Sequence, residues 1–247
     1  MTAPRALITG GGIRVGRAIA LALADAGFDL VLHYRSSAEP AQEVAQLVRS
    51  RGRSVELVQA DLATEDGCNK VVEAAGAVDV LVNNAALYEA IPFDELTAAS
   101  WDHMLAINCR APALLSRGLL PSLQASTLEG GGVIINIGDI GGTRPAPGYA
   151  HYSVSKAGIL MLTRALAVEL APRVRVNSVS PGTVLAPTDL SVEVLDGIRD
   201  TIPAGRFGSA EDIARTVMFL VTGAPYVTGQ DIAVCGGRSV AGPMLAG

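Results

Sequence analysis

The stretch RALITGGGIRVG, from Arg5 to Gly16, largely determines the fold that we expect for this chain. Its first five residues are typical of a short buried strand, and glycines follow at once. Gly16 to Ala26 has the period of a helix and ends at Gly27, a residue type common just after helices. Because a helix N-terminus after a glycine turn can bind phosphate, we expect Thr9 to Gly16 to be part of a dinucleotide site. The alternative is a tight turn without a ligand.

Further short apolar runs alternate with stretches of helical period. These helical stretches include Glu43 to Arg51, which is followed by Gly52. Alternation of this kind predicts a parallel sheet with helices on both faces, in a doubly wound α/β fold of Rossmann type. No composition shift or repeat divides the chain, so we expect one domain over residues 1–247. The further predicted strands are Asp29–Tyr34, Ser54–Gln59, Val78–Asn83, Gly132–Ile137 and Arg173–Val179.

Composition argues against several classes of protein. Apolar residues make up 49% of the chain and charged residues 17%, which suits a buried sheet and argues against disorder. The formal net charge is −5 and no Lys or Arg run is present, so we expect neither nucleic acid nor a membrane as partner. Cys68, Cys109 and Cys235 are widely spaced, which predicts reduced thiols and no metal site. The first residues lack a signal-like pattern, so we expect a cytoplasmic protein.

The end of the second predicted strand reads His33, Tyr34, Arg35 and Ser36. Dinucleotide sites that prefer NAD have an acidic residue here, which holds the ribose hydroxyls. With no carboxylate to repel a 2′-phosphate, and with Arg35 and Ser36 able to bind one, the sequence favours NADPH (or NADP) as cofactor. Arg14 would add a second positive charge beside the phosphates. The alternative for Arg35 is a solvated surface arginine.

Tyr152 and Lys156 lie four residues apart in a stretch of helical period, so they share one helix face. A Tyr hydroxyl ionises near pH 10, too high for ready proton transfer at neutral pH. A nearby ammonium group favours the tyrosinate and would make the hydroxyl a usable acid or base. We therefore expect Lys156 to lower the pKa of Tyr152, and both residues to be catalytic.

With these features in order, the chain resembles the short-chain dehydrogenase/reductase family over nearly its whole length. The stretch NNAA (Asn83 to Ala86), Asn108, and the Pro-Gly pair after the sixth strand also match the family's motifs. The resemblance implies that Asn108 holds a water in a proton relay through Lys156, and that residues 227–239 contain the last strand. It also implies a homotetramer. The further residues that it assigns to the cofactor site are Gly10, Val15, Asp61, Leu62, Asn84, Ala85, Ala86, Pro181 and Gly182, together with Tyr152 and with Lys156, which would hold the nicotinamide ribose.

Two positions depart from the usual family pattern. Arg14 stands where the second glycine of the turn belongs, and Asp139 stands where the catalytic serine belongs, thirteen residues before Tyr152. Both departures resemble pteridine reductases and dihydromonapterin reductases. This narrower resemblance implies that Arg14 contacts both the cofactor and a pterin, and that Tyr88 stacks on the pterin. Simple packing is the alternative for Tyr88.

The chemistry of Asp139 supports the same hypothesis. An ionised carboxylate would repel the oxyanion formed when a carbonyl takes a hydride, but would stabilise the protonated form of a ring C=N group. The sequence therefore predicts NADPH-dependent reduction of a pterin-type C=N bond. The alternatives are an Asp139 that only caps its turn, a carbonyl reductase of unknown substrate, and a nucleotide-sensing protein without turnover. Residues 181–206 are predicted to form a lid over the substrate, with a passive insertion as the alternative.

Overall fold

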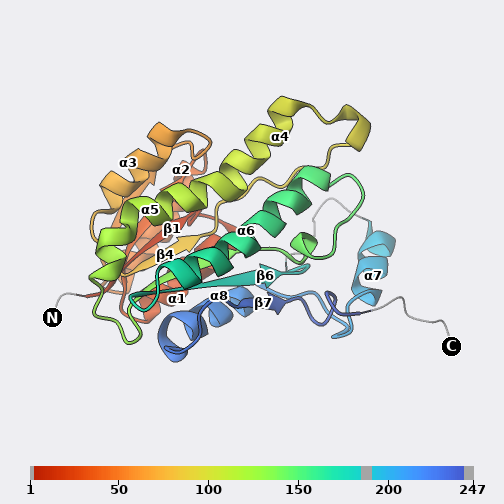
Figure 1. The fold of residues 1–247 in the computed structure, drawn as a ribbon. Coiled ribbons are helices and arrows are strands. Elements are labelled where there is room, and N and C mark those ends of the chain that lie inside the picture. The colour runs from red at the N-terminus through yellow and green to blue at the C-terminus, as the bar shows by residue number, and fades with distance from the viewer. Residues whose placement is uncertain (1–2, 185–190, 242–247) are drawn as a thin grey trace.

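The computed structural model describes residues 3–184 and 191–241, and its centre is a parallel sheet of seven strands. The strand order is β3-β2-β1-β4-β5-β6-β7 (Figure 1). All six strands predicted from apolar runs form, with ends that shift by two residues at most. The strands are β1 (Arg5–Thr9), β2 (Asp29–Tyr34), β3 (Val55–Gln59), β4 (Val80–Asn83), β5 (Gly132–Ile137), β6 (Val174–Pro181) and β7 (Asp231–Val234).

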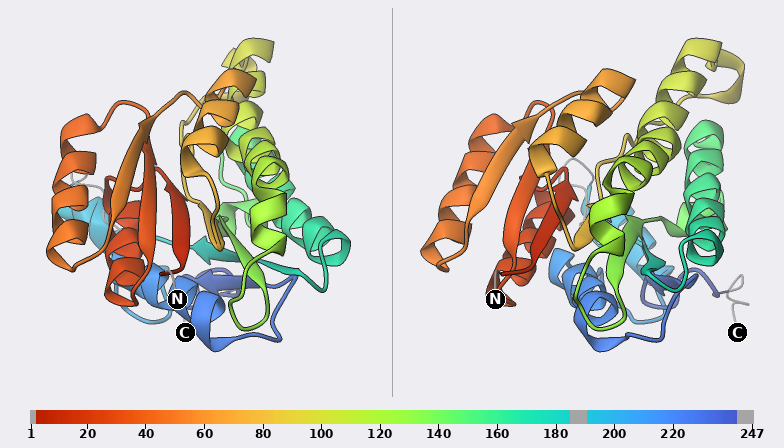
Figure 2. Two further views of the ribbon diagram at one scale, coloured as in Figure 1. Left: turned by 90° about the vertical axis from the view of Figure 1, so that its left-hand side faces the viewer. Right: turned by 60° about the vertical axis from the view of Figure 1, so that its left-hand side comes forward.

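Helices cover both faces of the sheet, which confirms the predicted doubly wound α/β fold (Figure 2). Side chains of α1, α2 and α8 pack into one apolar core, and those of α3, α5 and α6 pack into the other. The helices are α1 (Arg14–Asp25), α2 (Ala38–Ser50), α3 (Glu65–Ala75), α4 (Ala98–Leu105), α5 (Ala111–Gln124), α6 (Ala150–Glu169), α7 (Val192–Asp200) and α8 (Ala210–Met218).

The central strands are apolar on both sides because both of their faces are covered. In β1, Ala6 and Ile8 point into the core under α1 and α8, while Leu7 points into the core under α5 and α6. All three side chains are fully buried. This two-sided burial is why the strands read as continuous apolar runs rather than as an alternating pattern.

The order of the strands reverses direction between β1 and β4, which are neighbours in the sheet. From β1 the chain proceeds outward through β2 to β3, then returns to β4 and continues outward to β7 on the other side. Connections diverge at this point, so a crevice opens beyond the carboxyl ends of the two strands. The glycine turn follows β1 and the NNAA stretch follows β4, which brings both predicted motifs to the crevice.

The segment predicted as a lid contains a helix, α7, which the sequence reasoning did not anticipate. Residues 185–190 of this segment lie outside the described residues. A lid function for 181–206 therefore stays a prediction. Within the described ranges no helix is long and apolar enough to cross a membrane.

Candidate active site

The glycine turn between β1 and α1 is built on close backbone contacts. A Cβ atom at Gly16 would lie 2.1 Å from the carbonyl oxygen of Gly10, so only glycine fits there. Gly10 itself has a φ of 64°, in the left-handed region that glycine adopts without strain. The turn thus brings backbone N–H groups to the start of α1, where a phosphate would bind.

Arg14 departs from the family's glycine but keeps the backbone conformation that glycine favours. Its φ is 49°, and it is the single non-glycine residue with positive φ in the described ranges. This conformation costs an L-residue about 1–2 kcal/mol. The side chain is exposed and lines the crevice. The strain makes a functional role for the guanidinium the better explanation.

Polar side chains tie the turn to the end of β4. The Thr9 hydroxyl accepts hydrogen bonds from the backbone N–H groups of Asn84 and Ala85, both at 2.9 Å. The Asn84 side-chain amide donates to the carbonyl oxygens of Thr9, at 2.8 Å, and Gly10, at 3.1 Å. Asn84 therefore holds the two sides of the crevice together.

His33 fixes the same turn from the side of β2. One ring nitrogen, Nδ1, lies 3.3 Å from the backbone nitrogen of Gly10, and the other, Nε2, lies 3.1 Å from the carbonyl oxygen of Ala60. Burial lowers the pKa of His33, against the opposing effects of the Ala60 carbonyl and of Asp61. A neutral ring suits both contacts, because Nδ1 must accept while Nε2 donates.

A cavity of about 370 Å³ occupies the crevice and collects most of the residues predicted to bind the cofactor. Its lining contains one carboxylate, Asp61, whose Oδ1 accepts from the backbone of Ala63 at 2.9 Å. The predicted residues in the lining are Gly10, Arg14, Val15, His33, Tyr34, Arg35, Ser36, Asp61, Leu62, Asn84, Ala85 and Ala86. Pro181 ends β6 and Gly182 follows it, and both lie outside this lining. This lining fits a dinucleotide.

Asp139 and Tyr152 meet at the carboxyl end of β5. Asp139 Oδ1 accepts a hydrogen bond from the backbone N–H of Gly141 at 2.6 Å, and the Tyr152 hydroxyl donates to Oδ2 at 2.9 Å. Asp139 therefore does cap its turn, as the structural alternative proposed, and it also contacts the catalytic candidate. Tyr152 is 6% exposed. Burial, and next the Asp139 carboxylate, raise the pKa of the Tyr152 hydroxyl well above its ordinary value.

Lys156 does not have the effect on Tyr152 that we expected. The two residues do share a face of α6, but the Lys156 ammonium donates to the carbonyl oxygen of Ile137 at 2.9 Å. It lies 5.8 Å from the centre of the Tyr152 ring. Burial lowers the pKa of Lys156 to about 8, while Asp139 opposes this shift. The pKa of Tyr152 is raised and not lowered as we predicted, because burial, and next the Asp139 carboxylate beside the hydroxyl, favour the neutral form.

Asn108 lies in a π-helical turn, Ala106–Arg110, between α4 and α5. Its amide clamps the chain after β4: Oδ1 accepts from the N–H of Leu87 at 2.7 Å, and Nδ2 donates to the Leu87 carbonyl at 2.9 Å. The same Nδ2 group donates to the Ser155 hydroxyl on α6 at 3.0 Å. The side chain thus connects the cofactor crevice to the catalytic helix. Its role in a water relay stays a prediction.

A second cavity, of about 640 Å³, contains Tyr88, Asp139 and Tyr152 in its lining. The Tyr88 ring stacks on that of Tyr149, with centroids 4.9 Å apart, and meets Tyr152 edge-on at 4.9 Å. Tyr88 is nevertheless 65% exposed, so much of its ring is available to a ligand. Arg14 lines the first cavity and is not part of the lining of the second.

Comparison with known proteins identifies the family. A family model described as enoyl-(acyl carrier protein) reductase matches residues 12–239. A short-chain dehydrogenase/reductase from Serratia marcescens superposes with a TM-score of 0.87 at 32% identity, over 96% of this chain and 98% of that one. The chain belongs to the short-chain dehydrogenase/reductase family.

Two relatives of this short-chain dehydrogenase/reductase carry a substrate in their names. A 3-oxoacyl-(acyl-carrier-protein) reductase of Aggregatibacter actinomycetemcomitans is 42% identical over 240 residues, which cover 94% of this chain and 97% of the relative. Acetoin dehydrogenase of Salmonella typhimurium superposes with a TM-score of 0.88 at 30% identity, over 98% of both chains. The chain is therefore an oxidoreductase of a family that uses NADH or NADPH. These names do not support the expected closeness to pteridine reductases.

Sequence reasoning missed part of the larger cavity of this short-chain dehydrogenase/reductase, which we take as the candidate substrate cavity. Tyr149, Arg144 and Arg238 all line it, but only the tyrosine is close in sequence to Tyr152. Arg144 lies in the loop GGTRPAPG, where a charged residue beside glycines and prolines was a usable signal. Arg238 follows β7, and only the fold brings it to the site. No cluster of three or more His, Cys, Asp or Glu residues that could hold a metal is present in residues 3–184 and 191–241.

Proposed function

We propose that this chain is an NADPH-dependent carbonyl reductase, with Tyr152 as the proton donor. The observation that carries the proposal is the position of the Tyr152 hydroxyl, which lines the substrate cavity and is held by Asp139 at 2.9 Å. The names of the relatives support a keto substrate, because 3-oxoacyl groups carry a ketone.

Two guanidinium groups support NADPH rather than NADH. Arg14 and Arg35 both line the nucleotide cavity and are exposed to it. Neither forms an ion pair with a carboxylate within the described ranges. A 2′-phosphate would provide the anion that both lack.

The reaction needs one hydride and one proton. The bound cofactor would supply the hydride. Tyr152 would give its proton to the carbonyl oxygen, and Lys156, held by Ile137, would stabilise the negative charge left on the site. For a ketone, Asp139 would act as a structural group that holds the Tyr152 hydroxyl at 2.9 Å, because its carboxylate cannot donate to the developing oxyanion as a serine would. Asn108 would act by positioning Leu87 and Ser155.

Asp139 itself favours a second candidate, a ring C=N bond such as that of a dihydropterin. Its carboxylate faces the reaction site, and in the ionised form it stabilises a protonated imine nitrogen. The exposed ring of Tyr88, already stacked on Tyr149, could hold a planar bicyclic substrate. The contact of Arg14 with such a substrate is part of this second candidate.

Turnover of two substrate classes tests these proposals. NADPH oxidation is followed with a 3-oxoacyl thioester and with dihydrobiopterin, dihydromonapterin and dihydrofolate, for the wild type and Asp139→Ser. We expect ketone turnover that persists or improves in the serine variant. Pterin turnover that collapses in the variant would establish the second candidate instead. Tight NADPH binding without oxidation of any substrate would leave the nucleotide-sensing alternative.

Cofactor preference is tested separately with Arg35→Ala. We expect the KM for NADPH to rise about tenfold, since one charge-assisted contact to the phosphate is lost, while the KM for NADH stays unchanged. Arg49→Ala, a surface arginine of α2, is the matched control. Equal effects on both cofactors would contradict a role for Arg35 at the 2′-phosphate.

We also propose a homotetramer in which α6 contributes to the contacts. Val154, Met161 and Val168 recur every seven residues on this helix and are 47%, 60% and 83% exposed, which leaves an apolar strip uncovered in the single chain. Light scattering coupled to gel filtration measures the mass directly. A monomer at micromolar concentration would contradict the proposal.

A further inference from the structure

The substrate cavity contains two positively charged side chains that the proposed reaction does not use. Arg144 comes from the loop after β5, and Arg238 comes from the segment after β7. They are 94 residues apart in the chain, and the fold brings them together: the Arg144 side chain donates a hydrogen bond to the backbone carbonyl of Arg238. Both line the same cavity as Tyr152 and Asp139.

Within residues 3–184 and 191–241, the partners of these two arginines leave their charges unneutralised. The Arg144 side chain donates to the carbonyl of Arg238. The Arg238 guanidinium donates to the Thr183 hydroxyl at 2.6 Å. Both acceptors are neutral. Neither arginine lies within 4.0 Å of a carboxylate in the described part of the chain. A guanidinium has five N–H donors, so each group keeps several for a ligand.

The carboxylates that line this cavity do not neutralise Arg144 or Arg238. Asp139 directs its two oxygens to Gly141 and Tyr152. Asp200, at the end of α7, is exposed in the lining of this cavity and forms no ion pair with either arginine. The electrostatic effect of Arg238 reaches the Tyr88 ring, where it opposes the rise in pKa that burial causes. Since Tyr88 contacts Tyr152, the positive charge lies one aromatic ring away from the reacting group.

We propose that Arg144 and Arg238 form a recognition site for an anionic group on the substrate, a carboxylate or a phosphate. The inference rests on the proposed reductase function and adds the substrate class: a molecule whose reducible bond lies at Tyr152 and whose anionic arm extends past Tyr88. Arginine suits this role because its planar fork matches the oxygens of both anions. The two anions share this chemistry, and the experiment separates them.

Binding is measured first, without turnover, by calorimetry on the NADP-loaded protein. The probes are benzoate, phenyl phosphate and the neutral benzamide. Saturation with NADP keeps Arg14 and Arg35 occupied, so that the anionic probes do not bind there. We expect at least one anion to bind about tenfold or more tightly than benzamide. The tighter anion identifies the carboxylate or the phosphate as the natural group. Benzamide binding as tightly as both anions, or no binding by either anion, would overturn the proposal.

Variants then locate the effect. In Arg144→Gln and Arg238→Gln the preference for the anion should fall about tenfold, whereas Arg49→Gln removes a charge on α2 and should leave it unchanged. Circular dichroism confirms that the variants fold. An anion preference that persists in both pocket variants would refute the assignment.

Turnover separates this inference from the proposed function. Acetoacetate and its methyl ester carry the same ketone, but only the acid carries a charge. In the two pocket variants the KM for acetoacetate should rise about tenfold with kcat nearly constant, and the ester should be unaffected. If the proposed function fails, neither ketone oxidises NADPH but the calorimetric preference remains. If only the inference fails, both ketones are reduced and the variants affect them equally.

Discussion

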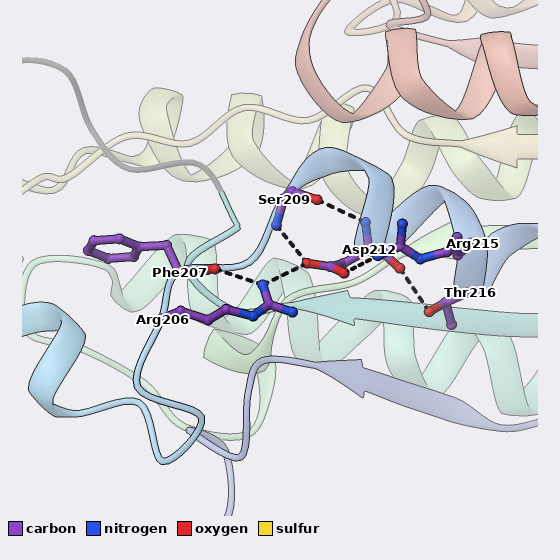
Figure 3. Close-up of polar contacts among 6 residues, drawn as sticks. All are labelled: Arg206, Phe207, Ser209, Asp212, Arg215 and Thr216. Carbon is purple, nitrogen blue, oxygen red and sulfur yellow. Dashed lines mark hydrogen bonds and ion pairs between the residues drawn. The ribbon is translucent and has the colours of Figure 1, made fainter.

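Asp139 and Asp212 are two aspartates with the same local task and different surroundings. Each caps the start of a helical segment: Asp139 accepts from the backbone of Gly141 at 2.6 Å, and Asp212 accepts from the backbone of Ser209 at 2.9 Å. Asp212 then binds two guanidinium groups, of Arg206 at 3.2 Å and of Arg215 (Figure 3). The other oxygen of Asp139 faces the hydroxyl of Tyr152 instead.

The difference teaches that a capping pattern does not distinguish a structural carboxylate from a reactive one. Ser209 and the Arg206 guanidinium hold the pKa of Asp212 below its ordinary value, so it stays ionised and inert. Asp139 accepts a hydrogen bond from the phenol of Tyr152, beside the larger cavity. The role of each aspartate depends on the partner of the carboxylate oxygen that does not cap the helical segment. For Asp139 this partner is Tyr152, which comes from a different helix, α6.

The largest expected effect on activity comes from removing the Tyr152 hydroxyl, the partner of Asp139. Tyr152→Phe should lower kcat by about 10²–10⁴, the range for loss of a general acid. The free energy of unfolding should change by only about 1 kcal/mol, since one hydrogen bond is lost. Arg215→Gln removes the corresponding partner of Asp212 and should leave kcat unchanged. Steady-state kinetics and urea unfolding measure both. Comparable loss of activity in the two variants would break the comparison.

The two carboxylates can be exchanged for amides as a matched pair. Asp139→Asn should lower kcat about ten- to hundredfold, because the amide oxygen keeps the contact with Gly141 and the NH2 group cannot accept a hydrogen bond from the Tyr152 hydroxyl, which is then no longer held. Asp212→Asn should keep kcat within about twofold, because Asp212 lines neither cavity of the candidate active site. The kinetics use the substrate that the wild type reduces fastest. An unaffected Asp139→Asn enzyme would reduce Asp139 to a turn cap.

The cations beside the two carboxylates should respond differently to pH. Asp212 has arginines, which keep their charge, whereas the cation near Asp139 is Lys156, whose pKa burial lowers to about 8. Activity should therefore fall above about pH 8, by up to about tenfold per pH unit, as the ammonium loses its proton.

The contribution of Lys156 to stability has the opposite sign. Its folded pKa of about 8 lies below the ordinary 10.5, so the unfolded chain binds more protons between these values. Stability from this group therefore rises with pH across that window while activity falls. Lys156→Met should abolish both dependences. An activity profile that stays flat to pH 10 would contradict the assignment of a charged lysine.

The smallest expected effect concerns the cap of α8. Ser209→Ala should cost about 1 kcal/mol of unfolding free energy, because the hydroxyl accepts from the backbone of Asp212.

The folded pKa of Asp212 is lowered, so the stabilisation that this carboxylate contributes is present above its unfolded pKa and is lost as pH falls through its folded pKa. Asp212→Asn should thus destabilise at neutral pH and converge with the wild type below about pH 4. A constant difference across pH would contradict the ionic contribution.

Local patterns predicted most of the fold and one side of the site. The runs Arg5–Thr9, Asp29–Tyr34 and Gly132–Ile137 form strands with the predicted bounds, because residues buried on both faces must be apolar. The cavity beyond β1 and β4 was also predictable, since its lining follows the ends of neighbouring strands; that it binds a nucleotide stays a prediction.

The substrate cavity was less predictable, because residues far apart in the chain form it. Arg238 reaches the cavity only through the placement of β7 beside β6. The effect of Asp139 on Tyr152 depends on a side-chain contact. The spacing of the two residues suggested this contact, but it did not show which oxygen of Asp139 would face the hydroxyl. Likewise, nothing in the sequence showed that Lys156 would bind the carbonyl of Ile137 instead of acting on the tyrosine.

The left-handed backbone of Arg14 has a consequence for attempts to make this protein more heat-resistant. A procedure that optimises folding alone would choose glycine at this position, because glycine removes the strain of the positive φ. The resulting chain would melt at a higher temperature and lack a guanidinium at the mouth of the nucleotide crevice. At this residue, thermal robustness and cofactor affinity are competing design goals.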